Sequence, residues 1–236
     1  MWKSERGFTV NELLVAVAIF SVILAEAYNA FLSSSQRLVL QNELVEMQTD
    51  ARAAMHFMVQ ELRLAFSTPS ITTTVSTNDT ITFDRLEDAG YSSGSNTITT
   101  LNDTRKTWSA SSFTASYTLR IISGTGAGQA RSISANTSTQ LTVSSAWDTP
   151  PDSSSFYVIT RKKTFSRTST SDNVLRYTAG NSVNQPLADL IIPNHSFSQP
   201  DTNTISITLT AQTRNIDPNT GQKRQYTVTE TVLKRN

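Results

Sequence analysis

Residues 8–32 read FTVNELLVAVAIFSVILAEAYNAFL, an apolar run that contains two carboxylates, Glu12 and Glu26. As an α-helix with a rise of about 1.5 Å per residue, the run is long enough to cross a hydrocarbon core of about 30 Å. Lys3 and Arg6 precede it, and basic residues beside such a segment tend to stay on the cytoplasmic side. The run therefore predicts a single-pass anchor in the inner (cytoplasmic) membrane, with the rest of the chain exported.

A secretory signal peptide is the competing interpretation of this run. Such a peptide ends in small residues followed by a break, whereas helical periodicity here continues without Pro or Gly as far as Pro69. Polar residues, among them Glu43 and Glu61, lie between the apolar positions, so the stalk is expected to be amphipathic. We expect the helix to end near residues 66–68, because proline disfavours helix in the preceding residue. The apolar positions recur at steps of three and four: Leu40, Leu44, Met47, Ala51, Met55, Met58, Leu62 and Ala65.

The carboxylate of Glu12 lies near the start of the apolar run. Carried to the bilayer centre, a carboxylate costs roughly 2.5–3.5 kcal/mol on insertion scales, and it costs less near the interface. Glu12 is therefore either an interfacial group that reaches the headgroups or a group with a partner inside the membrane. Glu26 is interpreted as a carboxylate that extends to the outer interface.

The string RGFTVNELLVAVAI, from Arg6 to Ile19, resembles the type III signal of type IV prepilins and pseudopilins. The pattern is a Gly, an apolar residue, three further residues, a Glu and an unbroken apolar helix. The resemblance implies that a prepilin peptidase cuts between Gly7 and Phe8 and methylates the new N-terminus on Phe8. It also implies that Glu12 meets the N-terminal amine of a neighbouring pilin or pseudopilin subunit during assembly on an inner-membrane platform.

The end of the stalk, residues 53–65, resembles that of PilW-like minor pilins and J-type pseudopilins, and the C-terminal segments 204–214 and 226–236 resemble the end of PilW-like proteins. No proline precedes Pro69, and Asn29 stands where many major pilins have one. The chain has no cysteine, so the C-terminal disulfide of many major pilins is impossible. These departures favour a minor pilin or pseudopilin over a main subunit.

The predicted fold is α+β, a long N-terminal helix packed on a β-rich head. Its expected parts are a leader (1–7), the pilin helix (8–66, with a membrane part 8–32 and a stalk 33–66) and the head (70–236). Ser- and Thr-rich segments of the head favour strands and turns. Strands are predicted at 80–84, 118–123, 140–144, 156–160, 173–178 and 187–192. The clearest hairpin alternates Ile205, Ile207, Leu209 and Ala211 and turns at residues 217–221.

Residues 113–160 resemble a small β-module of phage tail and surface proteins, which predicts an insertion in the head; strands integral to the head sheet are the alternative. The glycines at 124, 126 and 128 lack the Lys-Ser/Thr of a phosphate loop and are interpreted as turns. The Asp217–Gly221 segment has too few hard oxygen ligands for calcium and is interpreted as a turn.

The formal net charge is +1, from 20 basic and 19 acidic residues, so no nucleic-acid footprint is evident. The histidines, His56 and His195, have no recognisable nucleophile or metal partner in the sequence. We therefore expect neither catalysis nor a metal or cofactor. The functions to be compared are a minor pilin or pseudopilin that starts or caps a filament, a J-type pseudopilin of type II secretion, and a tip-displayed binding head. After export the protein is expected in a periplasmic or cell-surface filament.

Overall fold

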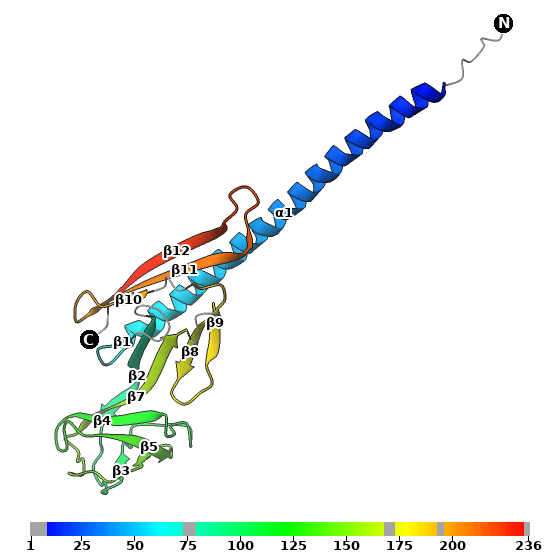
Figure 1. The fold of residues 1–236 in the computed structure, drawn as a ribbon. Helices are drawn as coiled ribbons and strands as arrows, with labels where there is room; N and C mark the ends of the chain where they lie inside the picture. Colours follow the sequence, from blue (N-terminus) through cyan, green and yellow to red (C-terminus); the bar gives the residue numbers. More distant parts are fainter. Residues whose placement is uncertain (1–8, 73–78, 168–172, 193–195, 234–236) are drawn as a thin grey trace. The chain divides into compact units, whose positions relative to one another are not determined.

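The computed structural model describes residues 9–72, 79–167, 173–192 and 196–233. The predicted fold class is confirmed: one long N-terminal helix, α1 (Val10–Arg63), is packed on a β-rich head of antiparallel strands (Figure 1). The chain divides into two compact units. The first contains α1 up to Glu46 together with residues 213–224, and the second contains the remainder.

The end of α1 comes at Arg63, slightly before the predicted end at residues 66–68. The next two residues form a tight final turn, in which each N–H donates to the carbonyl three residues earlier. Ala65 then forms a β-bridge with Arg85 in the head. The helix thus ends because the chain begins to pair with a strand, before Pro69 takes effect.

Strands make up nearly all the regular structure after the helix. They are β1 (Ser70–Thr72), β2 (Thr80–Tyr91), β3 (Thr100–Asn102), β4 (Tyr117–Ser123), β5 (Ala130–Asn136), β6 (Gln140–Val143), β7 (Phe156–Ser166), β8 (Leu175–Ala179), β9 (Gln185–Ala188), β10 (Ser196–Ser198), β11 (Thr204–Ile216) and β12 (Lys223–Leu233).

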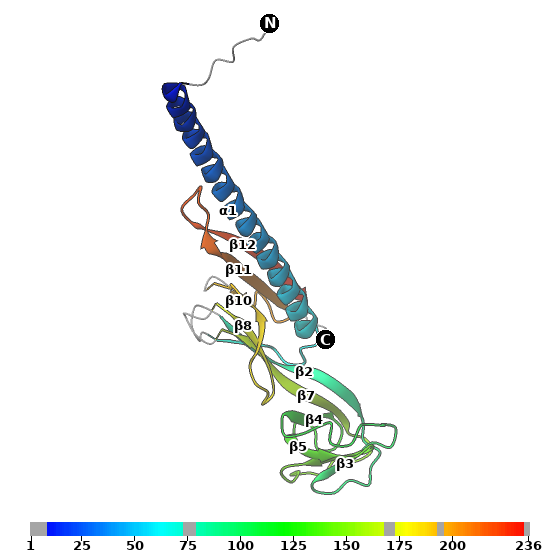
Figure 2. The same ribbon diagram turned by 90° about the vertical axis from the view of Figure 1, so that its right-hand side faces the viewer.

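Within the described residues, nine of these strands form one sheet in the order β1-β2-β7-β4-β5-β6-β3, with β8 beside β7 and β9 beside β8. Its centre is the long antiparallel pair of β2 and β7, which Figures 1 and 2 both show side by side. The pair runs from Ile81 opposite Phe165 to Tyr91 opposite Phe156. A bulge between Leu86 and Asp88 shifts the register midway.

The head-packed part of α1 buries the predicted apolar stripe. The ring of Phe57 contacts Phe165 of β7 and Tyr177 of β8, with centroids 6.1 and 5.1 Å apart. Tyr177 also donates to the carboxylate of Glu61 at 3.3 Å. Seven of the predicted positions are buried, and Leu44 is half-buried: Leu40, Met47, Ala51, Met55, Met58, Leu62 and Ala65.

A separate apolar cluster lies among β3 to β7. Its buried members are Leu101, Leu119, Ile121, Ile133, Leu141, Val143, Trp147, Tyr157 and Ile159. Leu101 and the packed ring of Trp108 precede residue 113, so the cluster begins earlier in the chain than the predicted insertion at 113–160. The strands of that segment also belong to the nine-stranded sheet. Gly124, in the turn after β4, has φ +80°, and a Cβ there would lie 2.2 Å from a backbone oxygen.

A polar network joins this cluster to β2. Lys106 Nζ and Trp108 Nε1 donate to the two carboxylate oxygens of Asp88 at 2.6 and 2.7 Å. Burial pushes the pKa of Asp88 upward, but these hydrogen bonds outweigh it and hold the pKa below its usual value. The buried hydroxyl of Tyr157 donates to Asp103 at 2.8 Å, and burial beside that carboxylate raises the pKa of Tyr157.

Among the residues that the structure describes, the last strands form a three-stranded sheet in the order β10-β11-β12. The predicted alternation along β11 is confirmed, since Ile205, Ile207, Leu209 and Ala211 are all buried. Cross-strand threonine pairs, Thr208 with Thr229 and Thr210 with Thr227, join β11 to β12 with hydroxyl distances of 3.2 and 3.1 Å.

Candidate functional site: the N-terminal helix and the hairpin turn beside it

The first turn of α1 contains the predicted assembly residue Glu12. Gly7 and Phe8, the predicted cleavage and methylation positions, lie outside the described residues. Glu12 Oε2 accepts hydrogen bonds from the backbone N–H and the hydroxyl of Thr9, both at 2.9 Å, and the N–H of Glu12 donates to Thr9 Oγ1 at 3.3 Å. This reciprocal pair is a capping box, which satisfies backbone donors left open at a helix start.

The capping box gives Glu12 a role within its own helix that was not predicted, although its Thr-x-x-Glu signature is visible at residues 9–12. A carboxylate also stabilises the positive end of the helix dipole. Because an ionised carboxylate has about four acceptor positions, this cap leaves room for a further donor such as an amine.

The segment from Val10 to Leu32 is helical, and its side chains are exposed throughout. Its axial length is about 33 Å at ~1.5 Å per residue, close to the thickness of a hydrocarbon core. Ser21 donates its hydroxyl to the carbonyl of Val17 at 2.6 Å, so this polar side chain is satisfied within the helix. By length and composition, α1 is therefore able to cross a membrane.

Glu26 lies on this segment about 24 Å along the axis from Val10, at ~1.5 Å per residue. Its side chain is exposed, and no described residue forms a hydrogen bond or ion pair with its carboxylate. The two acids of the run therefore differ in structure: Glu12 is held by Thr9, whereas Glu26 is not.

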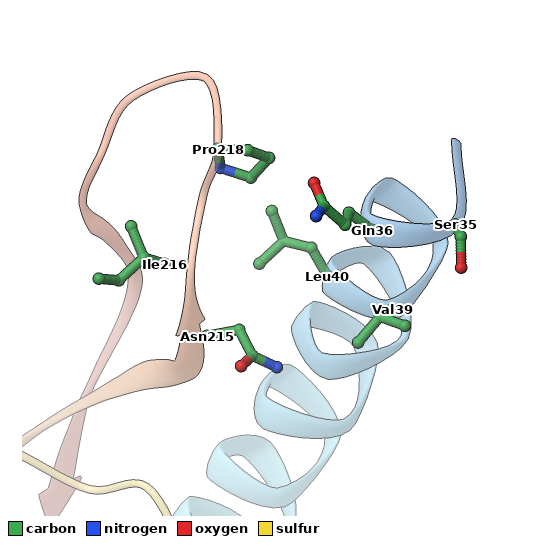
Figure 3. Close-up of a pocket in the computed structure, with 7 residues that line it drawn as sticks. All are labelled: Ser35, Gln36, Val39, Leu40, Asn215, Ile216 and Pro218. Carbon is green, nitrogen blue, oxygen red and sulfur yellow. The ribbon is translucent and has the colours of Figure 1, made fainter. Parts of the chain in front are cut away.

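The character of α1 changes at Leu40, where the helix meets the turn between β11 and β12. Leu40 is buried, whereas Val39 beside it is exposed. Figure 3 shows Leu40 directed toward the turn and Pro218 directed toward the helix, whereas the side chain of Ile216 points away from the helix. These side chains border a hollow of about 360 Å³, which Ser35, Gln36 and Asn215 complete.

A carboxylate–amide clamp holds the turn against the helix. Asn215 donates to Glu43 through its side-chain Nδ2 at 2.6 Å and its backbone N–H at 3.2 Å. Only 8% of Glu43 is exposed. From the sequence, Glu43 was recognised only as a polar residue between the apolar positions of the stalk. In the structure the turn covers that side of the helix and supplies hydrogen bonds to the carboxylate.

The turn itself is organised by Asp217, whose side chain is 1% exposed. Its carboxylate accepts from the N–H of Asn219 at 2.9 Å and from Arg224 at 2.7 and 2.6 Å. The N–H of Asn219 and the guanidinium of Arg224 hold the pKa of Asp217 below its usual value. Because Asn219 and Arg224 both donate hydrogen bonds to its carboxylate, Asp217 acts as a turn-forming residue.

A second, polar hollow of about 240 Å³ lies beside the same turn. Arg37, Gln41, Asn219 and Arg224 line it together with Leu40 and Leu44, and so does the carboxylate of Asp217, which is bonded to Arg224. Cationic and amide side chains therefore line this hollow, and one of its cations, Arg224, is already bonded to the carboxylate of Asp217.

The histidines were not expected to be catalytic. His56 lies on α1, where its Nε2 is 3.4 Å from Gln60 Nε2. His195 lies outside the described residues. Within the part of the chain that the structure describes, no group of three His, Asp or Glu side chains is placed to hold a metal ion.

Comparison with known proteins gives no further assignment: no family model, curated protein or solved structure matches the chain.

Proposed function

We propose that the protein is a type IV pilin-like subunit, a minor pilin or pseudopilin that is made as a membrane-anchored precursor. A prepilin peptidase cuts it after Gly7 and methylates Phe8. The mature subunit then enters a filament through its N-terminal helix. The proposal combines the string from Arg6 to Ile19 with the form of α1.

The observation that carries the proposal is the change of environment along one unbroken helix. From Val10 to Val39 the side chains of α1 are exposed and largely apolar, and from Leu40 onward a stripe of them is buried. The helix that contains the membrane-length segment therefore continues into the head without a linker. Such a subunit can leave the bilayer only if other apolar helices replace the lipid around its exposed segment.

Glu12 supplies the specific contact in this account. In the apolar environment of packed helices, a carboxylate needs a cationic or hydrogen-bonding partner. The capping hydrogen bonds from Thr9 satisfy part of that need, and we propose that the N-terminal amine of a neighbouring subunit supplies the rest.

Filament incorporation of Glu12→Ala tests this role, with Glu26→Ala as the matched control. Both changes remove one carboxylate from the exposed segment, but only Glu12 is part of the first turn. We expect both variants to be cut after Gly7 and only Glu12→Ala to be depleted from sheared filaments. Normal incorporation of Glu12→Ala, or equal depletion of both variants, would contradict the pairing role. A Thr9→Ala variant that remains in filaments would separate loss of the cap from loss of the amine partner.

A further inference from the structure

The turn between β11 and β12 is held beside one part of α1 by the hydrogen bonds between Asn215 and Glu43. Its residues Asn215, Ile216 and Pro218 line the same hollow as helix positions between Ser35 and Leu40. Leu32, the last apolar residue of the anchor run, lies only a few residues earlier on the same helix. The turn is therefore adjacent to the end of the membrane-length segment.

The rise of the helix gives the distance of the turn from the hydrocarbon core of the bilayer. Arg37 is about 7–8 Å beyond Leu32 along the axis, at ~1.5 Å per residue. The headgroup layer adds roughly 5–8 Å to each side of a hydrocarbon core of about 30 Å. With the apolar run across the bilayer, Arg37 and the turn beside it lie in the outer headgroup layer.

The charges of this region are arranged for an anionic neighbour. Its basic residues are exposed or half-exposed: Arg37, Arg214, Lys223 and Arg224. The region has three acids, and the third, Glu46, is paired with Arg214. The other two are bonded within the protein, Glu43 to Asn215 and Asp217 to Arg224. Both Arg37 and Lys223 are exposed, and within the described part of the chain neither lies within ion-pair distance of a carboxylate, although Arg37 interacts electrostatically with Asp217.

Apolar exposure accompanies the charge. Ile216 is 58% exposed at the turn, and Pro218 is exposed beside it. Exposed apolar side chains next to cations are typical of surfaces that lie in a membrane interface, where the apolar groups enter the acyl boundary and the cations meet phosphates.

We propose that the β11–β12 turn and Arg37 form a binding surface for anionic phospholipid headgroups. The phosphate groups of the lipid contact the exposed cation Arg37, with the side-chain amides of Gln41 and Asn219 as further donors beside it. Lys223 and the exposed side of the turn extend the contact over the bilayer surface. This inference rests on the proposed function, because it requires the membrane-anchored precursor. The surface would hold the hairpin against the bilayer before assembly.

Because the protein has no cysteine, single cysteines can report depth in the full-length chain. We would place one cysteine at Thr220 in the turn, one at Ser34 after the apolar run and one at Ala53. Ala53 is about 31 Å beyond Leu32 along α1, at ~1.5 Å per residue. Each cysteine is labelled with a fluorophore, and the uncleaved protein is reconstituted into phosphatidylcholine vesicles. The vesicles contain equal small amounts of nitroxide-labelled phosphatidylglycerol or nitroxide-labelled phosphatidylcholine.

We expect both quenchers to act at Ser34 and Thr220 and neither to act at Ala53. At Thr220 the phosphatidylglycerol quencher should act more strongly, because each Lys or Arg near anionic headgroups favours their contact by about fivefold. Arg37→Gln with Lys223→Gln should remove that preference. Arg63→Gln with Lys162→Gln, which removes the same charge from other exposed positions, should retain it.

Equal quenching of Thr220 by the two lipids would overturn the proposal. Quenching at Ser34 without quenching at Thr220 would overturn it as well, because the turn would then lie away from the bilayer. Energy transfer between Thr220 labels on different chains, in place of lipid quenching, would assign the surface to a second copy of the chain. If Ser34 were not quenched, residues 8–32 would not span the bilayer. That result would contradict both this surface and the membrane-bound precursor. Cleavage after Gly7 is measured separately, so failure of the lipid surface alone leaves the proposed function standing.

Discussion

Replacement of Asn215 by alanine should release the β11–β12 turn from α1. The change removes the 2.6 Å hydrogen bond from Asn215 Nδ2 to the carboxylate of Glu43 and leaves the weaker backbone hydrogen bond at 3.2 Å. Hydrogen bonds to charged groups contribute about 1.5–3 kcal/mol, and Glu43 is too buried for water to replace the amide fully. We therefore expect the turn to open more often by a factor of roughly 10 to 150.

Native-state hydrogen exchange of the full-length protein in detergent measures this opening. The reporting amides are those of Asp217 and Gly221, which are bonded within the turn to Gln222 O and Asp217 O at 2.9 and 2.8 Å. Amides between β2 and β7 serve as the internal reference, because local opening leaves distant cooperative units intact.

Matched variants separate the clamp from other effects of substitution. Asn219→Ala removes an amide from the same turn but retains the backbone N–H that binds Asp217, so its exchange should stay close to that of the wild type. Glu43→Ala should accelerate exchange, and the Glu43→Ala, Asn215→Ala double variant should be less destabilised than the sum of the single variants. Unchanged exchange in Asn215→Ala, or strict additivity in the double variant, would refute the clamp.

Three other variants test the head. Met58→Ala should lower the free energy of unfolding by about 2–5 kcal/mol, because it opens a cavity under a fully buried side chain; a loss below 1 kcal/mol in chemical denaturation would contradict this packing. The lowered pKa of Asp88 means that its stabilisation is present above the unfolded pKa of about 3.9 and is lost as pH falls through the folded pKa. Asp88→Asn should therefore melt earlier at neutral pH but lose less on acidification below about pH 4; parallel pH curves would contradict it. Replacing residues 88–159 by an Asn-Gly turn should leave cleavage after Gly7 and filament incorporation intact, since β2 and β7 remain paired from Ile81 opposite Phe165; loss of incorporation would show that the distal strands are needed.

Local periodicity was enough to predict the helix and the last hairpin. The stripe through Met47, Met58 and Leu62 follows the period of an α-helix, and the alternation through Ile205 and Ile207 follows the period of a strand. In both elements one face is buried by a single continuous partner, so the sequence pattern and the tertiary structure agree.

The contacts that position the hairpin turn were not predictable in this way. Glu43 and Asn215 are far apart in the sequence, and neither residue type signals a buried partner. Asp217 was correctly interpreted as a turn residue, but its ion pair with Arg224 depends on how β12 returns. The early end of α1 at Arg63 likewise depends on pairing with β2, which the local sequence does not specify.

The apolar cluster among β3 to β7 begins earlier in the chain than the sequence predicted. The prediction began the insertion at residue 113, where the strand and turn rhythm becomes regular. The cluster also includes Leu101 and Trp108, which lie in short or irregular segments. Those segments are held by the network around Asp88 and Asp103, and side-chain hydrogen bonds of this kind leave no periodic pattern in the sequence.

The most direct test of the central claim is the N-terminus of the protein made together with a prepilin peptidase. Mass spectrometry of the membrane fraction should find a chain that begins at an N-methylated Phe8. The Gly7→Val variant should remain as the uncut precursor, because the proposed peptidase requires a residue without a side chain before the cut. A wild-type chain that keeps its leader, or one cut within or after the apolar run as a secretory signal peptide would be, would contradict the account.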